Sequence, residues 1–362
     1  MDVDKPNIVV TGISGGLGLR LLPQLGAYSV TGIDLNPPST SHPIRFVRLD
    51  LGLEESCREL FLLLRELRPV ALIHLAFVMD PLRADIVDSD RMWQINVGGT
   101  ARVMEALTEV NRDEEIVKQF IFLSCVAAYG PNHPGPAAEE SKLAARTLPF
   151  AIHKMEADQT VQQRAPSARD CSVYVLRSAV FAGARISNHT LAAFRGLPTG
   201  TGKYAAQLRR HGRRIPFILP WGAEHLLRQI QFVHVEDVGR LILYILRKSE
   251  PEARRLTVLN ISGRGEPLTL QRCIDMAHSK LMKVPGEWSM MQALRFLWRM
   301  QISEIPPEAT SYLLGGQVMN LDRLREFLGP YYQEVIQYTV SDSFAECFAP
   351  DPNISSHISS LE

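Results

Sequence analysis

A glycine-rich segment directly follows the first apolar segment of the chain. A buried strand is predicted at residues 7–11 (Asn-Ile-Val-Val-Thr), and it is followed by Gly-Ile-Ser-Gly-Gly-Leu-Gly at residues 12–18. Residues 17–25 then have a helical pattern. Glycines between a strand and a helix let the backbone approach a pyrophosphate, whose charge faces the helix N-terminus. The sequence therefore predicts a dinucleotide-binding turn with these contacting residues: Gly12, Ser14, Gly15, Gly16, Leu17 and Gly18.

An acidic residue ends the second apolar segment. Residues 28–33 predict another strand, and Asp34 follows it, sixteen residues after Gly18. A carboxylate at this place accepts hydrogen bonds from the ribose hydroxyls of a dinucleotide. It would also repel a 2′-phosphate, and no lysine or arginine follows before Arg45. The pattern favours NAD over NADP.

Extended β-rich segments alternate with helical patterns through the first half of the chain. Helices are predicted at 54–67 and 88–110. Alternation of this kind indicates right-handed βαβ crossovers and a parallel sheet covered on both faces. The predicted fold is α/β, a Rossmann-type doubly wound parallel sheet, with strands near residues 7–12, 29–34, 44–50, 71–76, 118–125 and 171–178.

The alternation stops after about residue 180. Residues 1–180 are expected to form the NAD-binding domain, to which 231–262 return, because strand and helix patterns reappear there. Residues 181–230 and 263–342, rich in short helices and connectors, are expected to form a smaller substrate lobe. Residues 343–362 end in a polar segment and are expected to be a flexible tail.

Composition excludes several classes of protein. Apolar residues make up 46% of the 362, enough for a large core. Lys plus Arg and Asp plus Glu number 39 each, so the net charge gives no reason to expect a nucleic-acid partner or an anionic membrane surface. No apolar run reaches the ~18 residues of a membrane span, and the acidic N-terminus does not resemble a signal peptide. The five cysteines lack metal-site spacing and fit a reducing, cytoplasmic location; no metal is expected.

Further short motifs, in order and at suitable spacing, carry a family resemblance. The chain resembles the extended short-chain dehydrogenase/reductases, the group of NAD-dependent nucleotide-sugar epimerases and dehydratases, over about residues 7–335. The resemblance implies NAD as cofactor, a small-molecule substrate such as a nucleotide sugar, and additional cofactor-binding residues: Asp50, Leu51, Leu75, Ala76, Phe77, Asn96 and Lys154. The motifs are Asp50-Leu51, His74-Leu-Ala-Phe77, Asn96-Val-Gly-Gly-Thr100, Phe232-Val-His-Val-Glu-Asp237 and Asn260-Ile-Ser-Gly263.

The catalytic positions depart from the family pattern. Phe150-Ala-Ile-His-Lys154 has the form of the family's Tyr-x-x-x-Lys pair, but phenylalanine stands at the tyrosine position. Cys125 stands where the family has a serine. In the family, tyrosinate takes a proton from the substrate hydroxyl while NAD takes the hydride, and the lysine holds the ribose and lowers the phenol pKa. The resemblance therefore implies catalytic positions at Lys154, Cys125 and Phe150, with Phe150 unable to transfer a proton. Tyr129 is the candidate substitute, because it is expected at the C-terminal end of a parallel strand, where ligands bind in such sheets.

Three functions remain open on these residues. The first is an epimerase/dehydratase-like protein with altered or weakened acid–base catalysis. The second is a non-catalytic NAD-binding sensor or scaffold. The third is an oxidoreductase acting on a non-sugar hydroxy compound.

Two further features concern partners. The arginine-rich residues 209–214 are interpreted either as a clasp for a nucleotide diphosphate or as a solvated basic loop. Family members commonly pair through two long helices, which correspond here to 88–110 and 149–164, so a homodimer is expected. The apolar residues on these helices that are compatible with an interface are Met92, Val103, Leu107 and Met155.

Overall fold

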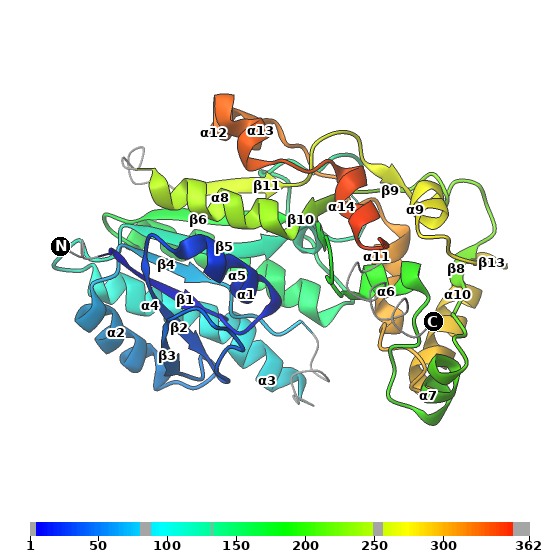
Figure 1. Ribbon diagram of the computed structural model, residues 1–362, viewed down its shortest axis with the longest axis horizontal. Coiled ribbons are helices and arrows are strands. Elements are labelled where there is room, and N and C mark those ends of the chain that lie inside the picture. Colours follow the sequence, from blue (N-terminus) through cyan, green and yellow to red (C-terminus); the bar gives the residue numbers. More distant parts are fainter. Residues whose placement is uncertain (1–4, 80–87, 132, 249–255, 350–362) are drawn as a thin grey trace, which may run out of the picture. The chain divides into compact units, whose positions relative to one another are not determined.

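The computed structural model describes residues 5–79, 88–131, 133–248 and 256–349. Two compact units make up the chain (Figure 1). Unit 1 comprises Met1–Ala179, Val235–Ile261 and Met319–Ile336. Unit 2 comprises Val180–His234, Ser262–Val318 and Gln337–Glu362.

Unit 1 is built on a seven-stranded parallel sheet in the order β11-β6-β5-β4-β1-β2-β3. The predicted Rossmann-type doubly wound fold is therefore confirmed. The central strands are buried along their whole length, as expected of parallel strands that are covered on both faces. The strands are β1 Asn7–Thr11, β2 Ser29–Asp34, β3 Arg45–Arg48, β4 Ala71–His74, β5 Gln119–Cys125, β6 Ser172–Ser178 and β11 Leu256–Ile261.

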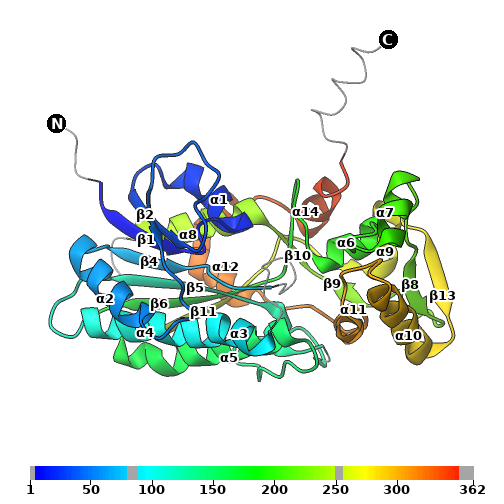
Figure 2. The ribbon, with the colours of Figure 1, turned by 90° about the horizontal axis from the view of Figure 1, so that it is seen from below.

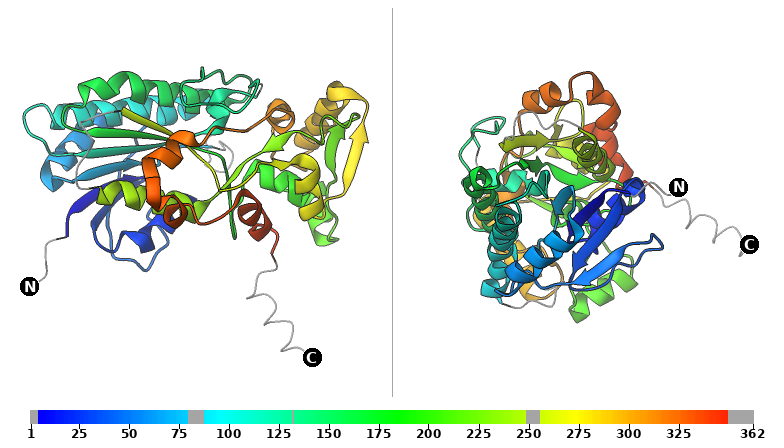
Figure 3. Two further views of the ribbon diagram at one scale, coloured as in Figure 1. Left: turned by 90° about the horizontal axis from the view of Figure 1, so that it is seen from above. Right: turned by 90° about the vertical axis from the view of Figure 1, so that its left-hand side faces the viewer.

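Helices cover both faces of this sheet. Helices α2, α4 and α5 lie on one face and α1 and α8 on the other (Figures 2 and 3). A large apolar core fills the space under α2, α4 and α5. The helices of unit 1 are α1 Gly16–Leu21, α2 Ser56–Leu67, α3 Ser89–Trp93, α4 Gly99–Val110, α5 Pro149–Arg164, α8 Val235–Arg247, α12 Asp322–Leu328 and α13 Tyr332–Val335.

The helix expected at 88–110 is interrupted. A π-helical segment at Gln94–Gly98 separates α3 from α4. Asn96 lies in this segment and is fully buried. π-Helical turns inside helices frequently occur at functional sites.

Unit 2 has three two-stranded sheets surrounded by short helices. Its core is rich in aromatic side chains, with Phe194 stacked on Phe217 at 4.7 Å between ring centroids. The strand pairs are β7 Val180–Ala182 with β10 Phe232–His234, β8 Phe217–Pro220 with β13 Leu281–Val284, and β9 Gln229–Ile230 with β12 Leu268–Thr269. The helices are α6 His189–Arg195, α7 Lys203–Arg210, α9 Leu270–Met276, α10 Gly286–Arg299, α11 Thr310–Leu314 and α14 Val340–Glu346.

The start of the segment expected to be a tail is helical. Helix α14 runs to Glu346, beyond the expected boundary at residue 343, and it begins with a capping box between Thr339 and Asp342. Phe344 is fully buried and packs against Phe232 at 4.7 Å between ring centroids. This burial orders the segment. Residues 350–362 lie outside the described part of the chain.

No helix in the described ranges is long and apolar enough to cross a membrane.

Candidate functional site

The turn after β1 leaves no space for side chains at two of its glycines. Gly12 has φ +72°, and a Cβ there would lie 2.4 Å from the backbone nitrogen of Ala76. A Cβ on Gly18 would lie 2.5 Å from the carbonyl oxygen of Ile13. Gly16, in contrast, is exposed, and a Cβ there would meet nothing within 4 Å. The tight glycines fold the turn against the sheet, and Gly16 faces open space.

Asp34 is fixed beside this turn at the end of β2. Its carboxylate accepts hydrogen bonds from the backbone N–H of Ser14 at 3.0 Å and of Leu35 at 2.7 Å. The Ser14 hydroxyl donates to the carbonyl of Asn36 at 2.5 Å. These hydrogen bonds join the segments that follow β1 and β2, and they fix the position of the Asp34 carboxylate.

Asp50 and Leu51 follow β3. Asp50 forms an ion pair with Arg91 and accepts a hydrogen bond from the backbone N–H of Gly52 at 2.9 Å. Leu51 is buried and belongs to the core of unit 1. Arg91 was not expected from the sequence, because the spacing between Asp50 and Arg91 belongs to no short motif.

A chain of buried hydrogen bonds holds the segment after β4. Thr11 bonds to Nδ1 of His74 at 2.7 Å, and Nε2 of His74 bonds to Thr100 at 3.1 Å. Burial and the charge of Lys154 lower the pKa of His74 to about 3. His74 is therefore neutral at physiological pH, and it links β1, β4 and α4. The backbone N–H of Ala76 also donates to the Thr11 hydroxyl, at 3.3 Å.

Asn96 holds the next residues of the same segment. Its side chain accepts from the backbone N–H of Val78 at 2.7 Å and donates to the carbonyl of Val78 at 2.8 Å. The amide thus pairs with Val78 as a neighbouring strand would. Leu75, Ala76 and Phe77 lie between this anchor and His74, and each is half-buried.

Lys154 is buried near the end of β5. Its ammonium donates to the carbonyl of Leu123 at 2.7 Å and lies 3.6 Å from the centroid of the Phe77 ring. Burial lowers the pKa of Lys154 to about 8, although Cys125 and Asp158 act in the opposite direction. Lys154, Phe77 and Cys125 therefore gather at the carboxyl end of the sheet, where ligands bind in folds of this class.

Phe150 and Cys125 are the two residues at which the sequence differs from the family pattern that it resembles. Phe150 is half-buried at the second residue of α5, four residues before Lys154 and so on the same helix face. Cys125 ends β5, and burial raises the pKa of its thiol while Lys154 partly opposes the shift. The preceding Ser124 is buried, and its hydroxyl has no hydrogen-bond partner in the described part of the chain. These two positions therefore carry a ring without a hydroxyl group and a thiol whose pKa is raised by burial.

Tyr129 belongs to a buried polar cluster. Its hydroxyl donates to the Asn260 side chain at 2.7 Å and accepts from Arg177 at 2.9 Å. Arg177 forms a bidentate ion pair with Asp158 at 2.8 and 2.9 Å and donates to the carbonyl of Glu139. Burial raises the pKa of Tyr129, and Arg177 opposes this shift. Both hydrogen-bonding roles of this hydroxyl are used, which favours a structural role over proton transfer.

The arginine-rich loop lies in unit 2. Arg209 donates to the carbonyl of Gly200 at 2.7 Å and to that of Pro198, so it holds the preceding loop. Arg210, Arg213 and Arg214 are exposed.

The described residues contain no cluster of three metal-ligating side chains.

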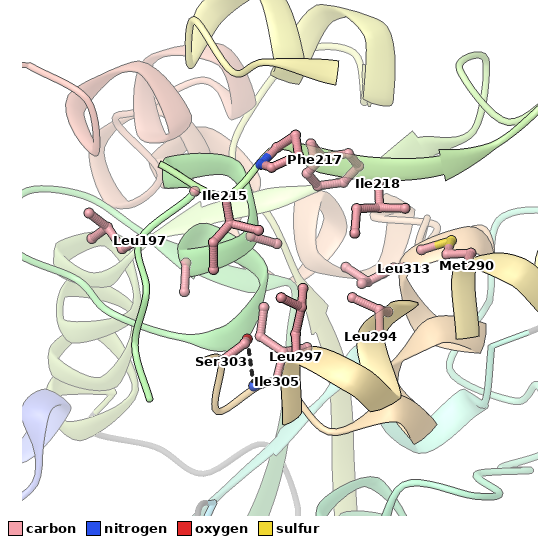
Figure 4. Close-up of a pocket in the computed structure, with 14 residues that line it drawn as sticks. Leu197, Ile215, Phe217, Ile218, Met290, Leu294, Leu297, Ser303, Ile305 and Leu313 are labelled. Carbon is pink, nitrogen blue, oxygen red and sulfur yellow. Dashed lines mark hydrogen bonds between the residues drawn. The ribbon is translucent and has the colours of Figure 1, made fainter. Parts of the chain in front are cut away.

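Unit 2 also contains a small apolar pocket with a cavity volume of about 40 Å³ (Figure 4). Met290, Leu294 and Leu297 project into it from α10. Ser303 is the one polar side chain among the residues that line it, and it accepts a hydrogen bond from the Ile305 N–H at 3.2 Å. No sequence pattern indicates this pocket, because α10 and the residues between β7 and β8 that form it are far apart in the chain.

The sheet order, the glycine turn after β1 and the carboxylate at the end of β2 define a Rossmann-type nucleotide-binding protein. The model of the NAD dependent epimerase/dehydratase family matches residues 8–261, and the chain belongs to this family. The resemblance seen in the sequence is confirmed, and NAD is the cofactor of the family. A comparison with curated proteins found no match.

Solved structures of similar fold cover nearly the whole chain. MoeE5, in complex with UDP-glucuronic acid and NAD, is 18% identical with a TM-score of 0.61, over 94% of this chain and 97% of that one. A tyrosine-to-phenylalanine mutant of UDP-glucuronic acid 4-epimerase from Bacillus cereus, in complex with UDP-4-deoxy-4-fluoro-glucuronic acid and NAD, is 18% identical with a TM-score of 0.62, over 98% and 100%. The dTDP-glucose 4,6-dehydratase from Bacillus anthracis, in complex with NAD, is 17% identical with a TM-score of 0.64, over 95% of both chains. At these identities the likeness shows the fold.

Proposed function

We propose that unit 1 binds NAD across the turn after β1. The observation that carries this proposal is the pairing of that turn with Asp34: Gly12 and Gly18 exclude side chains, Gly16 faces open space, and the carboxylate is held beside them. The Gly16 region would hold the pyrophosphate, and Asp34 would hold the adenosine ribose. Lys154 would hold the nicotinamide ribose. Phe77 and Cys125 lie beside its ammonium and would line that end of the site.

NAD is expected to bind more tightly than NADP. A carboxylate at position 34 accepts hydrogen bonds from ribose hydroxyls and repels a 2′-phosphate. Calorimetric titration of the purified protein with each cofactor measures the preference. Tighter binding of NADP would show that Asp34 does not contact the ribose.

The reaction we propose is oxidoreduction, epimerisation or dehydration of a nucleotide sugar or related hydroxy substrate, with weakened acid–base catalysis. Bound NAD would supply hydride transfer. Lys154, with a pKa of about 8, carries a positive charge at neutral pH that stabilises nearby oxyanions. Phe150 has no hydroxyl to take the substrate proton, so turnover should be slow.

A turnover assay tests this function. The wild-type protein is incubated with NAD and a panel of UDP- and dTDP-sugars, while NADH absorbance and sugar epimers are followed. Slow conversion of one sugar class supports the proposal. Tight NAD binding with no conversion of any sugar supports one of the two alternatives that follow.

A non-catalytic NAD-binding sensor or scaffold is favoured by one observation. Phe150 lacks the hydroxyl, and the Tyr129 hydroxyl is used by Asn260 and Arg177, so neither residue offers an acid–base group. A sensor should bind NAD and NADH with different affinities without converting one into the other. Titrations with both forms measure this difference.

An oxidoreductase for a non-sugar hydroxy compound is the other alternative. The apolar pocket of unit 2, at about 40 Å³, is smaller than the roughly 300–1,000 Å³ of ligand pockets, so the substrate assay decides between the two classes. NADH formation with a panel of apolar secondary alcohols, compared with the sugar panel, separates these two substrate classes.

A further inference from the structure

Large aromatic side chains are exposed on unit 2. Trp288 is 69% exposed, Trp221 62% and Phe296 60%. Tryptophan is highly buried on average in folded proteins, so an exposed pair near one helix is unusual. Trp288 and Phe296 both lie on α10.

Helix α10 has two distinct faces. Met290 and Leu294 are buried and, with Leu297, point into the apolar pocket (Figure 4). At 3.6 residues per turn, positions 288, 295 and 299 lie within about 40° of one another on the opposite side of the helix. That side therefore carries the exposed Trp288, the half-buried Arg295 and the exposed Arg299.

Trp221 lies near the start of α10 in space. Its backbone N–H donates to the carbonyl of Val284 at 2.8 Å, and Val284 lies at the end of β13, two residues before α10 begins. We refer to Trp288, Arg295, Phe296 and Arg299 as the α10 face.

The segment that contains the α10 face is rich in basic residues. Residues 280–300 contain four basic side chains (Lys280, Lys283, Arg295 and Arg299) and one acidic side chain (Glu287), a net charge of 4 − 1 = +3. The chain as a whole has 39 residues of each sign, which gave no reason to expect a membrane partner. The local excess of positive charge therefore differs from the zero net charge of the whole chain.

We propose that the α10 face docks on an anionic lipid membrane surface. Tryptophan and phenylalanine side chains insert at the boundary between lipid headgroups and acyl chains. Arginines beside them attract anionic headgroups, as juxtamembrane basic residues do. The binding is peripheral and reversible, and it is independent of NAD.

Other occupants fit these observations less well. A second copy docking through the same face would bring the arginines of both copies into one interface, because a two-fold interface uses the same patch on each subunit. A nucleic-acid strand stacks successive bases on neighbouring rings in a groove. Trp288 and Phe296 are eight residues apart, about 12 Å along the outer side of a helix.

Sedimentation with lipid vesicles tests the proposal on the full chain. Vesicles of phosphatidylcholine alone are compared with vesicles of three parts phosphatidylcholine and one part phosphatidylserine. We expect binding to the anionic vesicles that weakens with added salt, and little binding to the neutral ones. Replacing Arg295→Glu and Arg299→Glu together should weaken anionic-vesicle binding by at least roughly 25-fold, about fivefold for each arginine lost.

The aromatic contribution is tested separately. Trp288→Ser with Phe296→Ser should weaken vesicle binding by at least about tenfold, because apolar insertion is lost while the arginines remain. Leu62→Ser and Arg65→Glu are the matched controls: both residues are exposed on α2 of unit 1, with Leu62 53% exposed, and neither change should affect vesicle binding.

Three results would overturn the proposal. The first is equal sedimentation of the wild type and the Trp288→Ser/Phe296→Ser variant with anionic vesicles. The second is a wild-type dimer that becomes monomeric in that variant, which would assign the face to a second copy. The third is binding of a fluorescent single-stranded oligonucleotide, lost in the same variant, without vesicle binding.

Discussion

We expect Phe150 to limit proton transfer at the proposed site. It lies on the same face of α5 as Lys154, and its ring is half-buried. The Phe150→Tyr change adds one oxygen at a position that water can reach. We expect a gain in turnover of about 10²- to 10⁴-fold, because a positioned acid–base group contributes that much.

Stability should change little in Phe150→Tyr, by less than about 0.5 kcal/mol. NADH formation over the sugar panel is compared for the wild type, Phe150→Tyr, and Phe150→Tyr with Cys125→Ser, which we expect to be faster still. Phe150→Leu is the control without a hydroxyl. Substantial wild-type turnover that Phe150→Tyr leaves unchanged would show that another group carries the proton, and Tyr129→Phe would then identify or exclude Tyr129.

Lys154 should make stability depend on pH. Its pKa is about 8 in the folded chain against an ordinary value of 10.5, because burial disfavours the charge. Between these two values the unfolded chain holds a proton that the folded chain has released, so folding becomes more favourable as pH rises. Below about pH 8 both states are protonated, and this contribution is constant.

The comparison that isolates this effect is Lys154→Met. From neutral pH to about 10.5, urea unfolding should show the wild type gaining up to roughly 3 kcal/mol relative to Lys154→Met, at about 1.4 kcal/mol per pKa unit. Lys142→Met, at an exposed lysine, should show no such gain. A difference between wild type and Lys154→Met that stays constant with pH would contradict the buried, proton-releasing lysine.

Some of these residues are predictable from sequence, and others are not. Gly12 and Asp34 are predictable because local chain geometry and a fixed spacing from β1 determine what they can do. His74 is part of a recognisable motif, but its bonds to Thr11 and Thr100 join residues up to 63 positions apart. Arg91 is paired with Asp50 across 41 positions. Such pairs depend on how the strands are ordered in the sheet, which no short pattern records.

At the scale of elements, β6 and α5 are joined by a buried ion pair. Arg177 on β6 and Asp158 on α5 have almost no exposed side-chain surface. Burial alone would lower the pKa of Arg177, but the bonds to Asp158 raise it. Asp158 is one helical turn after Lys154, and its negative charge partly opposes the lowering of the Lys154 pKa by burial.

Removing one partner should be costly. Arg177→Met leaves the Asp158 carboxylate buried without a counter-ion, so we expect a loss of about 3 to 5 kcal/mol in unfolding free energy. The exposed pair of Arg112 and Glu109 provides the control, because Arg112→Met should cost less than about 1 kcal/mol. Urea denaturation measures both. Equal losses in the two variants would mean that the Arg177–Asp158 pair is solvated in solution.

The elements themselves were largely predictable. Strands β1, β2, β4, β5 and β6 lie where the apolar segments predicted them, because parallel central strands are apolar on both faces. The π-helical turn at Gln94–Gly98 was not predictable, because its sequence has an ordinary helical pattern. Its cause is tertiary: the Asn96 side chain pairs with Val78 after β4.

At the scale of the whole molecule, the chain returns to unit 1 twice. The return through β11 follows from the strand pattern at residues 256–262. The second return, Met319–Ile336, consists of two short helices, and short helices alone do not indicate which core they join. Asn260 on β11 connects to this second segment, because its side chain donates a hydrogen bond to the carbonyl of Asn320 at 3.1 Å.

The expected homodimer requires side chains of α4 and α5 that are not buried within their own chain. Met92, Val103 and Leu107 were expected to be compatible with an interface, but they are buried in the core of their own chain. Met155 on α5 is half-buried, as is Ile152 one turn earlier. Both side chains are available to a partner helix.

We therefore expect a homodimer that relies on the exposed side of α5. Light scattering at micromolar concentration should give twice the mass of 40.5 kDa, and Met155→Glu should shift the protein toward the monomer, because two carboxylates would face each other across a two-fold axis. Thr108→Glu on α4 is a second substitution at the same predicted interface, whereas Leu62→Glu on α2 is the control outside it. A wild-type mass of one chain, or dissociation caused by Leu62→Glu and not by Met155→Glu, would place the contact elsewhere.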